Sequence, residues 1–206
     1  MKTKFFSLLI IGGAISFAAC QGTGDGTPGD GDTTAIESSP DNTRVDENTV
    51  DSTAGTASTL DENTREFVTE CTSGGMMEVQ LGQLAQQKAV NQKVKDFGAM
   101  MVRDHTKAND DLKNAVSGKM NVPTTLSDRH QRTINDLNEE TGIKFDKDYI
   151  KTMIDAHETT INKLEKISKE SKDPAVVSFA NNTLPTVKEH LASAKAIRDE
   201  LSTMKK

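Results

Sequence analysis

The 206-residue sequence predicts an all-α domain, a four-helix bundle of two antiparallel hairpins joined by a long crossover that contains a short helix. From residue 66 onward the apolar residues recur at helical spacing, and nowhere does a period of two persist. The predicted connections within each hairpin are a few residues long, whereas the connection between the hairpins is long. One long crossover between two hairpins is the ferritin-like version of a four-helix bundle.

Four long helices are expected. The first covers residues 66–89 and the second residues 92–117. The third follows Asp146, and the fourth opens with Asp173 as its N-cap and Pro174 at the first helical position. Short turns at residues 90–91 and 171–172 make each pair of helices antiparallel. The crossover, residues 118–145, contains a short helix over about residues 127–140 and a stop at Gly142.

The N-terminus predicts export and lipid anchoring. Residues 1–19 contain two lysines followed by an apolar run that is too short for a convincing membrane span, which is typical of a cleavable signal peptide. Residues 17–20, Phe-Ala-Ala-Cys, resemble the lipobox of bacterial lipoproteins, which predicts lipidation of Cys20. Two acyl chains there anchor a protein stably. Ordinary cleavage near Ala18 or Ala19, leaving a free cysteine, is the alternative.

Residues 20–65 predict a disordered, acidic linker after the lipidated cysteine. They are rich in Gly, Ser, Thr, Asp and Asn, and they cannot bury enough apolar surface to offset the entropy of ordering. Residues 66–206 contain 21 acidic and 21 basic side chains. A neutral domain lacks the basic patch that nucleic acid requires. The expected partner is therefore a membrane, reached through the anchor at Cys20, in the cell envelope and at the outer membrane. No protein partner can be assigned.

A set of short motifs resembles the domain of unknown function 4142 family of exported, ferritin-like bacterial proteins, often labelled as outer membrane proteins. The resemblance covers about residues 67–201 and depends on the order and spacing of Met101-Val102-Arg103-Asp104-His105, Gly142, Phe145-Asp146, Tyr149, His157, Leu184-Pro185 and His190-Leu191. It implies a ferritin-like bundle and an envelope location. It implies no activity.

Each long helix places one ionisable residue on or beside its apolar stripe. These residues are Glu78, His105, His157 and His190, and each stands within about a turn of the middle of its helix. Because helices in an up-and-down bundle share a midplane, we expect the four side chains to meet at one level. One carboxylate and three imidazoles could bind a single Zn, Cu or Fe ion.

Two structural alternatives stay open. A histidine in a helical stripe is more often a hydrogen-bonded core residue than a metal ligand. Glu78 could also pair with a protonated histidine in a buried polar network that fixes the register of the helices. The domain would then be a non-catalytic structural or interaction module.

The sequence does not favour an enzyme. Carboxylate-bridged di-iron sites need a Glu three residues before a His on two of the helices. Three residues before each of the three histidines this sequence has an aliphatic residue instead: Val102, Ile154 and Val187. No nucleophile with a base, phosphate loop or open carboxylate pair is evident.

Two further polar residues, Asp104 and His130, are candidates for supporting roles, and Cys71 is not. Asp104 could hold a neighbouring imidazole, although a solvated carboxylate is the simpler interpretation. His130 lies on the stripe of the crossover helix, where it could support the cluster or, more simply, cover one end of the bundle. Cys71 is two turns from Glu78 and is expected to be a small buried hydrophobic residue.

Overall fold

The computed structural model describes residues 60–204, and every regular element within them is an α-helix. The signal peptide, Cys20 and most of the linker lie outside the described residues. The helices are α1 (Glu62–Lys88), α2 (Gln92–Ala115), α3 (Asp128–Glu139), α4 (Gly142–Glu170) and α5 (Pro174–Thr203). Among these five helices, none has a stretch long and apolar enough to cross a membrane.

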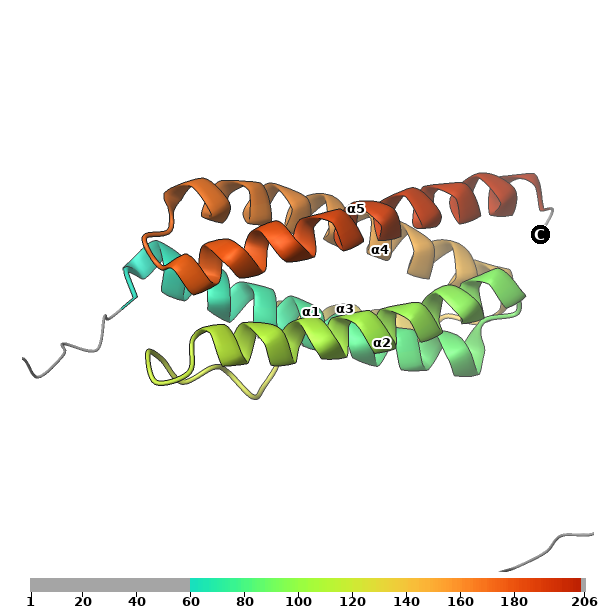
Figure 1. Ribbon diagram of the computed structural model, residues 1–206. Helices are drawn as coiled ribbons and strands as arrows, with labels where there is room; N and C mark the ends of the chain where they lie inside the picture. The colour runs from blue at the N-terminus through green and yellow to red at the C-terminus, as the bar shows by residue number, and fades with distance from the viewer. Residues whose placement is uncertain (1–59, 205–206) are drawn as a thin grey trace, which may run out of the picture. The chain divides into compact units, whose positions relative to one another are not determined.

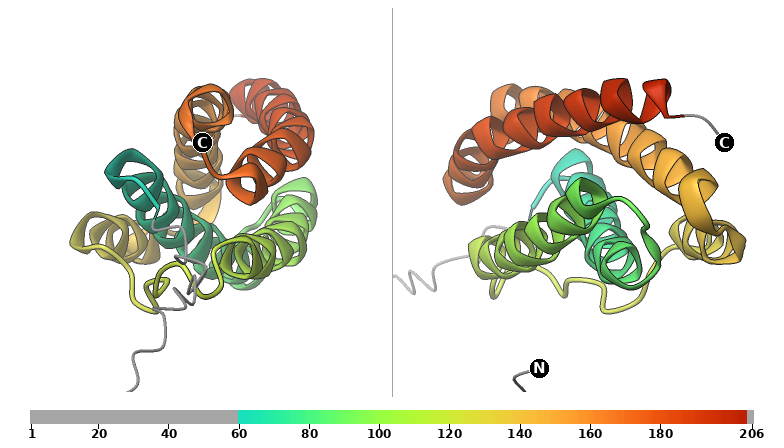
Figure 2. Two further views of the ribbon diagram at one scale, coloured as in Figure 1. Left: turned by 60° about the vertical axis from the view of Figure 1, so that its left-hand side comes forward. Right: turned by 90° about the vertical axis from the view of Figure 1, so that its right-hand side faces the viewer.

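The predicted all-α bundle is confirmed. Helices α1 and α2 form one hairpin and α4 and α5 the other, and the hairpins face each other through α1 with α4 and α2 with α5 (Figures 1 and 2). The short helix α3 lies along the outer side of α1 and also contacts α4. The crossover therefore covers one side of the bundle as well as connecting its halves.

Side-chain caps explain where three of the long helices begin. Asp61 accepts a hydrogen bond from the backbone N–H of Thr64, so α1 begins at Glu62, four residues before the expected start. Asn91 caps α2 in the same way. Asp173 accepts from two backbone N–H groups at the start of α5, with Pro174 in its first turn as predicted.

Helix α4 begins earlier than the sequence analysis expected. Gly142 was expected to end the crossover helix and Asp146 to precede the next one, but α4 begins at Gly142 itself. Gly142 has a φ of +61°, which favours glycine, and the chain enters the helix directly from it. The early start places Asp146 inside the first turns of α4.

Asp146 joins the two hairpins at the turn between α1 and α2. Its carboxylate is fully buried and accepts hydrogen bonds from the backbone N–H groups of Val90 and Asn91, at 3.1 and 2.8 Å. The carboxylate thereby satisfies two backbone donors that the end of a helix leaves without partners. This contact fixes the height of α4 relative to the first hairpin.

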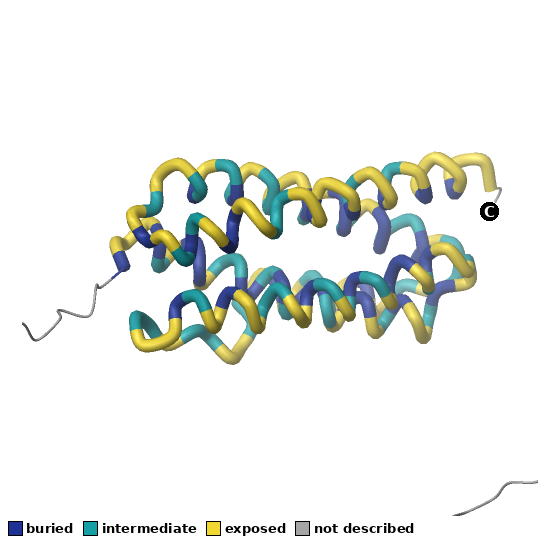
Figure 3. Tube along the Cα trace, in the orientation of Figure 1, coloured by how far each residue is buried: buried dark blue, intermediate teal, exposed yellow. Residues whose placement is uncertain are grey.

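The apolar residues of the interior form two clusters. The buried residues of each helix are dark blue in Figure 3. The first contains Met77, Met101, Met153 and Ala194, and the second contains Leu112, Leu164 and Val187 among others. On α2, α4 and α5 a histidine lies along the chain between members of the two clusters. Together with Glu78 of α1, the three histidines form a polar layer between the two apolar clusters.

Two glycines let α1 and α2 cross closely. A Cβ atom added at Gly82 would lie 2.6 Å from the carbonyl oxygen of Gly98, and one added at Gly98 would lie 2.7 Å from the carbonyl oxygen of Gly82. Real Cβ atoms do not approach carbonyl oxygens this closely, so larger residues would push the helices apart. Gly74 is different, because its nearest neighbour would be the His130 ring at 3.9 Å.

We predict opposite effects of alanine at these glycines. Gly82→Ala lowers the free energy of unfolding by about 1–3 kcal/mol, because the added methyl forces the backbones apart. Gly74→Ala raises it by up to about 1 kcal/mol, because alanine has the higher helix propensity. Urea unfolding followed by circular dichroism measures both, and equal effects of the two substitutions would contradict the close crossing.

Candidate metal centre

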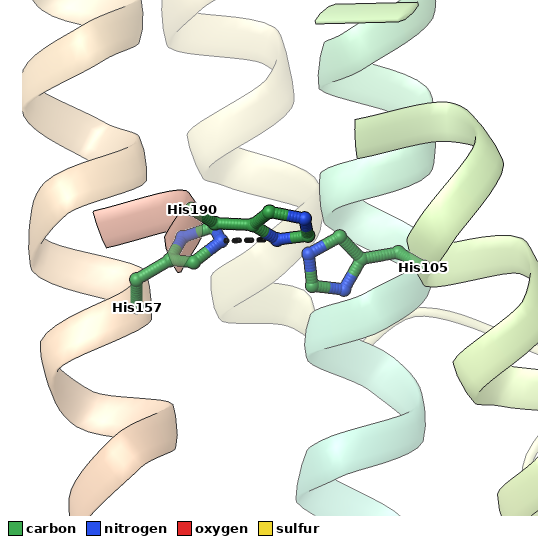
Figure 4. A group of neighbouring side chains, drawn as sticks. All are labelled: His105, His157 and His190. Carbon is green, nitrogen blue, oxygen red and sulfur yellow. Dashed lines mark hydrogen bonds between the residues drawn. The ribbon is translucent and has the colours of Figure 1, made fainter. Parts of the chain in front are cut away.

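Four helices each contribute one side chain to the polar layer. Glu78 comes from α1, His105 from α2, His157 from α4 and His190 from α5, and all four are buried, with exposed fractions of 3, 6, 0 and 3%. The three imidazole rings point toward one another from their helices (Figure 4). Their centroids form a nearly equilateral triangle with sides of 5.4, 5.5 and 5.4 Å.

The protonation of His157 follows from its contact with its own helix. Its Nδ1 lies 2.7 Å from the carbonyl oxygen of Met153, one turn earlier. A carbonyl oxygen can only accept, so Nδ1 carries the proton and donates. Burial lowers the pKa of His157, which keeps the ring neutral. The Nε2 atom of His157 therefore presents a lone pair to the middle of the layer.

His190 is held from its other side by Asp104. Its Nε2 donates to Oδ2 of Asp104 at 3.0 Å. Burial, together with the charges of the other two imidazoles, lowers the pKa of His190 to about 4 despite that hydrogen bond. The neutral ring presents the lone pair of Nδ1 toward His157, whose Nε2 is 3.4 Å away. This contact has the geometry of a hydrogen bond and is dashed in Figure 4, but with the proton of each neutral ring on its outer nitrogen, both facing nitrogens are acceptors.

His105 is held by Glu78. Its Nδ1 lies 3.0 Å from Oε2 of Glu78, which can only accept, and its Nε2 is buried without a hydrogen-bond partner among the described residues. Burial opposes the charge on both groups, but their mutual attraction outweighs it. The pKa of Glu78 falls to about 2 and that of His105 rises. A metal ion at Nε2 of His105 would have to displace any proton there.

The residues present fit a metal ion. One ring nitrogen from each of the three histidines lies within 4.8 Å of the others. Tetrahedral coordination at about 2.0–2.1 Å requires nitrogen separations of roughly 3.3 Å. The pair formed by His157 and His190 already has that spacing. His105 would have to move inward and release any proton on its Nε2. Each ring is held at its outer nitrogen by a carboxylate or a carbonyl, as metal-binding histidines usually are.

Glu78 takes the place that the second sequence hypothesis gave it. Its oxygens lie against Nδ1 of His105 and, at 3.5 Å, Nδ1 of His157, as in a carboxylate–histidine network, and it does not belong to the group of nitrogens that could hold an ion together. These are the outer nitrogens, so Glu78 orients the imidazoles from behind. The carboxylates of Glu78 and Asp104 bring negative charge to the outer nitrogens, although Asp104 is also paired with Arg103.

The remaining candidates have distinct positions. Asp104 contacts His190 and also pairs with Arg103 at the surface. His130 is not part of the layer, since its Nδ1 lies 2.7 Å from Oγ of Ser73 and its Nε2 faces Arg129. Cys71 is half-buried rather than buried, and desolvation raises the pKa of its thiol to about 12.

Sequence reasoning missed the carbonyl of Met153 and the hydroxyl of Tyr149. The carbonyl contact needs a particular rotamer of His157, and no sequence pattern reports a rotamer. The Tyr149 hydroxyl is buried without a partner among the described residues, and the charge of Glu78 adds to burial in raising its pKa. Its position on the apolar stripe of α4, one turn before Met153, is the sequence feature that could have predicted a buried hydroxyl near the polar layer.

The comparisons with known proteins agree with the fold. No curated protein matches the chain. A crystal structure of a DUF305 fragment from Deinococcus radiodurans is similar, with a TM-score of 0.61 and 10% sequence identity over 69% of this chain and 99% of that one. At this identity the likeness concerns the fold alone. Residues 49–197 match the domain of unknown function DUF4142. Because this match spans well over half of its length, the chain belongs to the DUF4142 family.

Proposed function

We propose that the bundle binds one transition-metal ion through Nε2 of His105, Nε2 of His157 and Nδ1 of His190. The observation that carries the proposal is the pair of acceptor nitrogens of His157 and His190, which face each other at 3.4 Å in the core. Two lone pairs at this distance repel each other, and burial removes the water that would screen them. A cation between them turns the repulsion into two bonds.

A proton shared by His157 and His190 is the alternative to a metal ion between their facing nitrogens. The pKa values of both His157 and His190 are lowered, so a proton is held weakly by this pair near neutral pH. A divalent metal ion also gains the third imidazole and the two supporting carboxylates. The balance of charge therefore favours a metal ion over a proton.

The donor set narrows the choice of metal. Three imidazole nitrogens suit Zn(II), Cu or Fe, whereas Ca²⁺ and Mg²⁺ prefer oxygen ligands. Three protein ligands leave one coordination position for water or another small ligand. We propose storage, sensing or stress protection as the role of the bound ion, and we propose no catalytic step.

We further propose that the domain works at the bacterial cell envelope as a lipoprotein. The support comes from the sequence, in which an apolar run directly precedes the lipobox-like residues 17–20. Cys20 would anchor the protein to the outer membrane, and residues 20–65 would connect the anchor to the bundle.

Metal analysis of the protein purified without chelator tests the binding proposal. We expect about one equivalent of Zn, Cu or Fe, and we expect His157→Ala to lose it because one ligand and the facing lone pair are removed. His130→Ala is the matched control, since this histidine lies outside the layer and its loss leaves the metal content unchanged. Circular dichroism checks that both variants are folded.

A protein that stays metal-free after incubation with Zn²⁺, and whose unfolding temperature does not change, contradicts the proposal. That result would favour the other function, an interaction module. The hydrogen bonds among Glu78, Asp104 and the histidines would then serve only to specify how the helices pack.

The carboxylates behind the rings give a second prediction. Glu78→Gln and Asp104→Asn each weaken Zn²⁺ binding by about 10- to 100-fold, because each removes a negative charge that orients and polarises an imidazole. Asp155→Asn is the control, because this carboxylate is exposed on α4 and pairs with Lys151. Competition with a chromogenic chelator measures the affinities, and equal affinities for all three variants would show that the carboxylates do not support the site.

The anchor is tested by Cys20→Ala in the full chain, expressed in a bacterium with two membranes. We expect the protein to move from the membrane fraction to the soluble periplasmic fraction, because the acyl chains are lost. Mass spectrometry of the wild-type N-terminus should show a lipidated cysteine. An N-terminus produced by cleavage near Ala18, without lipid, would contradict the anchor.

A further inference from the structure

A cavity of about 350 Å³ lies between α1, α3 and α4. Its lining includes the exposed side chains of Arg129 and Asp155, so it opens to the surface. It also includes Glu78, which is 3% exposed and belongs to the polar layer. The cavity therefore leads from solvent to the carboxylate that lies behind two of the three imidazoles.

Glu78, which lines this cavity, has one carboxylate oxygen without a hydrogen bond among the described residues. Its Oε2 is engaged by His105. Its Oε1 is buried, and the nearest donor, Nδ1 of His157 at 3.5 Å, donates to the Met153 carbonyl instead. A buried carboxylate oxygen without a donor is costly, and a cation is the partner that satisfies it most completely.

Gly74 keeps the cavity open. Glycine in the middle of a helix is unfavourable by about 0.5–1 kcal/mol relative to alanine. Close packing explains three other glycines of α1 and α2. A Cβ would lie 2.2–2.7 Å from a neighbouring oxygen at Gly75, Gly82 and Gly98. Gly74 has no such reason and lines the cavity, so a larger side chain there would fill the space.

The opposite side of the bundle is less suited to the passage of a cation. Between α2 and α5 the layer is covered by Asp104, whose carboxylate is paired with the exposed guanidinium of Arg103 at 2.8 Å. The Asp104–Arg103 pair has no net charge. The lining of the cavity has three carboxylates, Glu70, Glu78 and Asp155, against two cations, Arg129 and Lys163, and both cations pair with Glu70 at 3.0 and 2.9 Å.

We infer that this cavity is the access route for the metal ion, and that Glu78 is the buried carboxylate that receives the ion at the polar layer. The inference rests on the proposed metal site. A hydrated divalent cation exchanges a water ligand for Oε1 of Glu78 and then moves to the inner nitrogens of His105, His157 and His190. The transfer exchanges ligands only, with no change of oxidation state, and any proton displaced from His105 leaves to solvent.

Loading kinetics of the metal-free full chain with Co²⁺, followed by the visible absorption of the bound ion, test the route. Gly74→Leu and Ala156→Leu fill the cavity from facing walls, α1 and α4. We expect each to slow loading about tenfold, equivalent to about 1.4 kcal/mol in the barrier. Release to a chelator should slow equally, so the dissociation constant stays within about twofold. Using two variants keeps the test valid if one of them fails to fold.

Two controls accompany these variants. Gly74→Ala adds only a Cβ and should load at the wild-type rate, and Ser193→Leu places the same leucine side chain on the α2–α5 side. Wild-type rates in both cavity variants, or slow loading in Ser193→Leu instead, would overturn the access route while leaving the metal site intact. Failure of the wild-type protein to bind Co²⁺ or Zn²⁺ at equilibrium would instead refute the site itself.

Discussion

The centre of the bundle depends on one contact, in which the unprotonated nitrogens of two imidazoles, Nε2 of His157 and Nδ1 of His190, point their lone pairs at each other. His157 donates its only proton to the Met153 carbonyl, and His190 donates its only proton to Asp104. Neither ring can donate to the other without losing a hydrogen bond in the core. This constraint is the reason for our proposal of a cation between them, at a level to which Asp104 and Glu78 bring negative charge.

The packing elsewhere supports this arrangement. Gly82 and Gly98 bring α1 and α2 close together, and Asp146 fixes the turn of that hairpin against α4. Because the imidazole rings lie within a few ångströms of one another, the position of each helix along the bundle axis must be fixed about as closely. The two apolar clusters on either side of the layer exclude water, which strengthens every electrostatic interaction inside it.

Much of this was predictable from the sequence. The hairpins followed from short connections, and the convergence of the polar layer followed from four ionisable residues at mid-helix on apolar stripes. The start of α4 was not predictable, because Gly142 can end one helix or begin another. The position of Glu78 behind the rings, and the docking of His130 against Ser73, depend on rotamers and on how the crossover packs, which periodicity does not encode.

The protonation pattern of the histidine rings tests the central claim most directly, and two-dimensional NMR of ¹⁵N-labelled protein reports it with and without Zn²⁺. The account predicts protons on Nδ1 of His157 and Nε2 of His190 in both states, with the opposite nitrogens unprotonated and shifted when Zn²⁺ is added. A proton on Nε2 of His157 or Nδ1 of His190 in the presence of excess Zn²⁺, or resonances that do not respond to Zn²⁺, would contradict it.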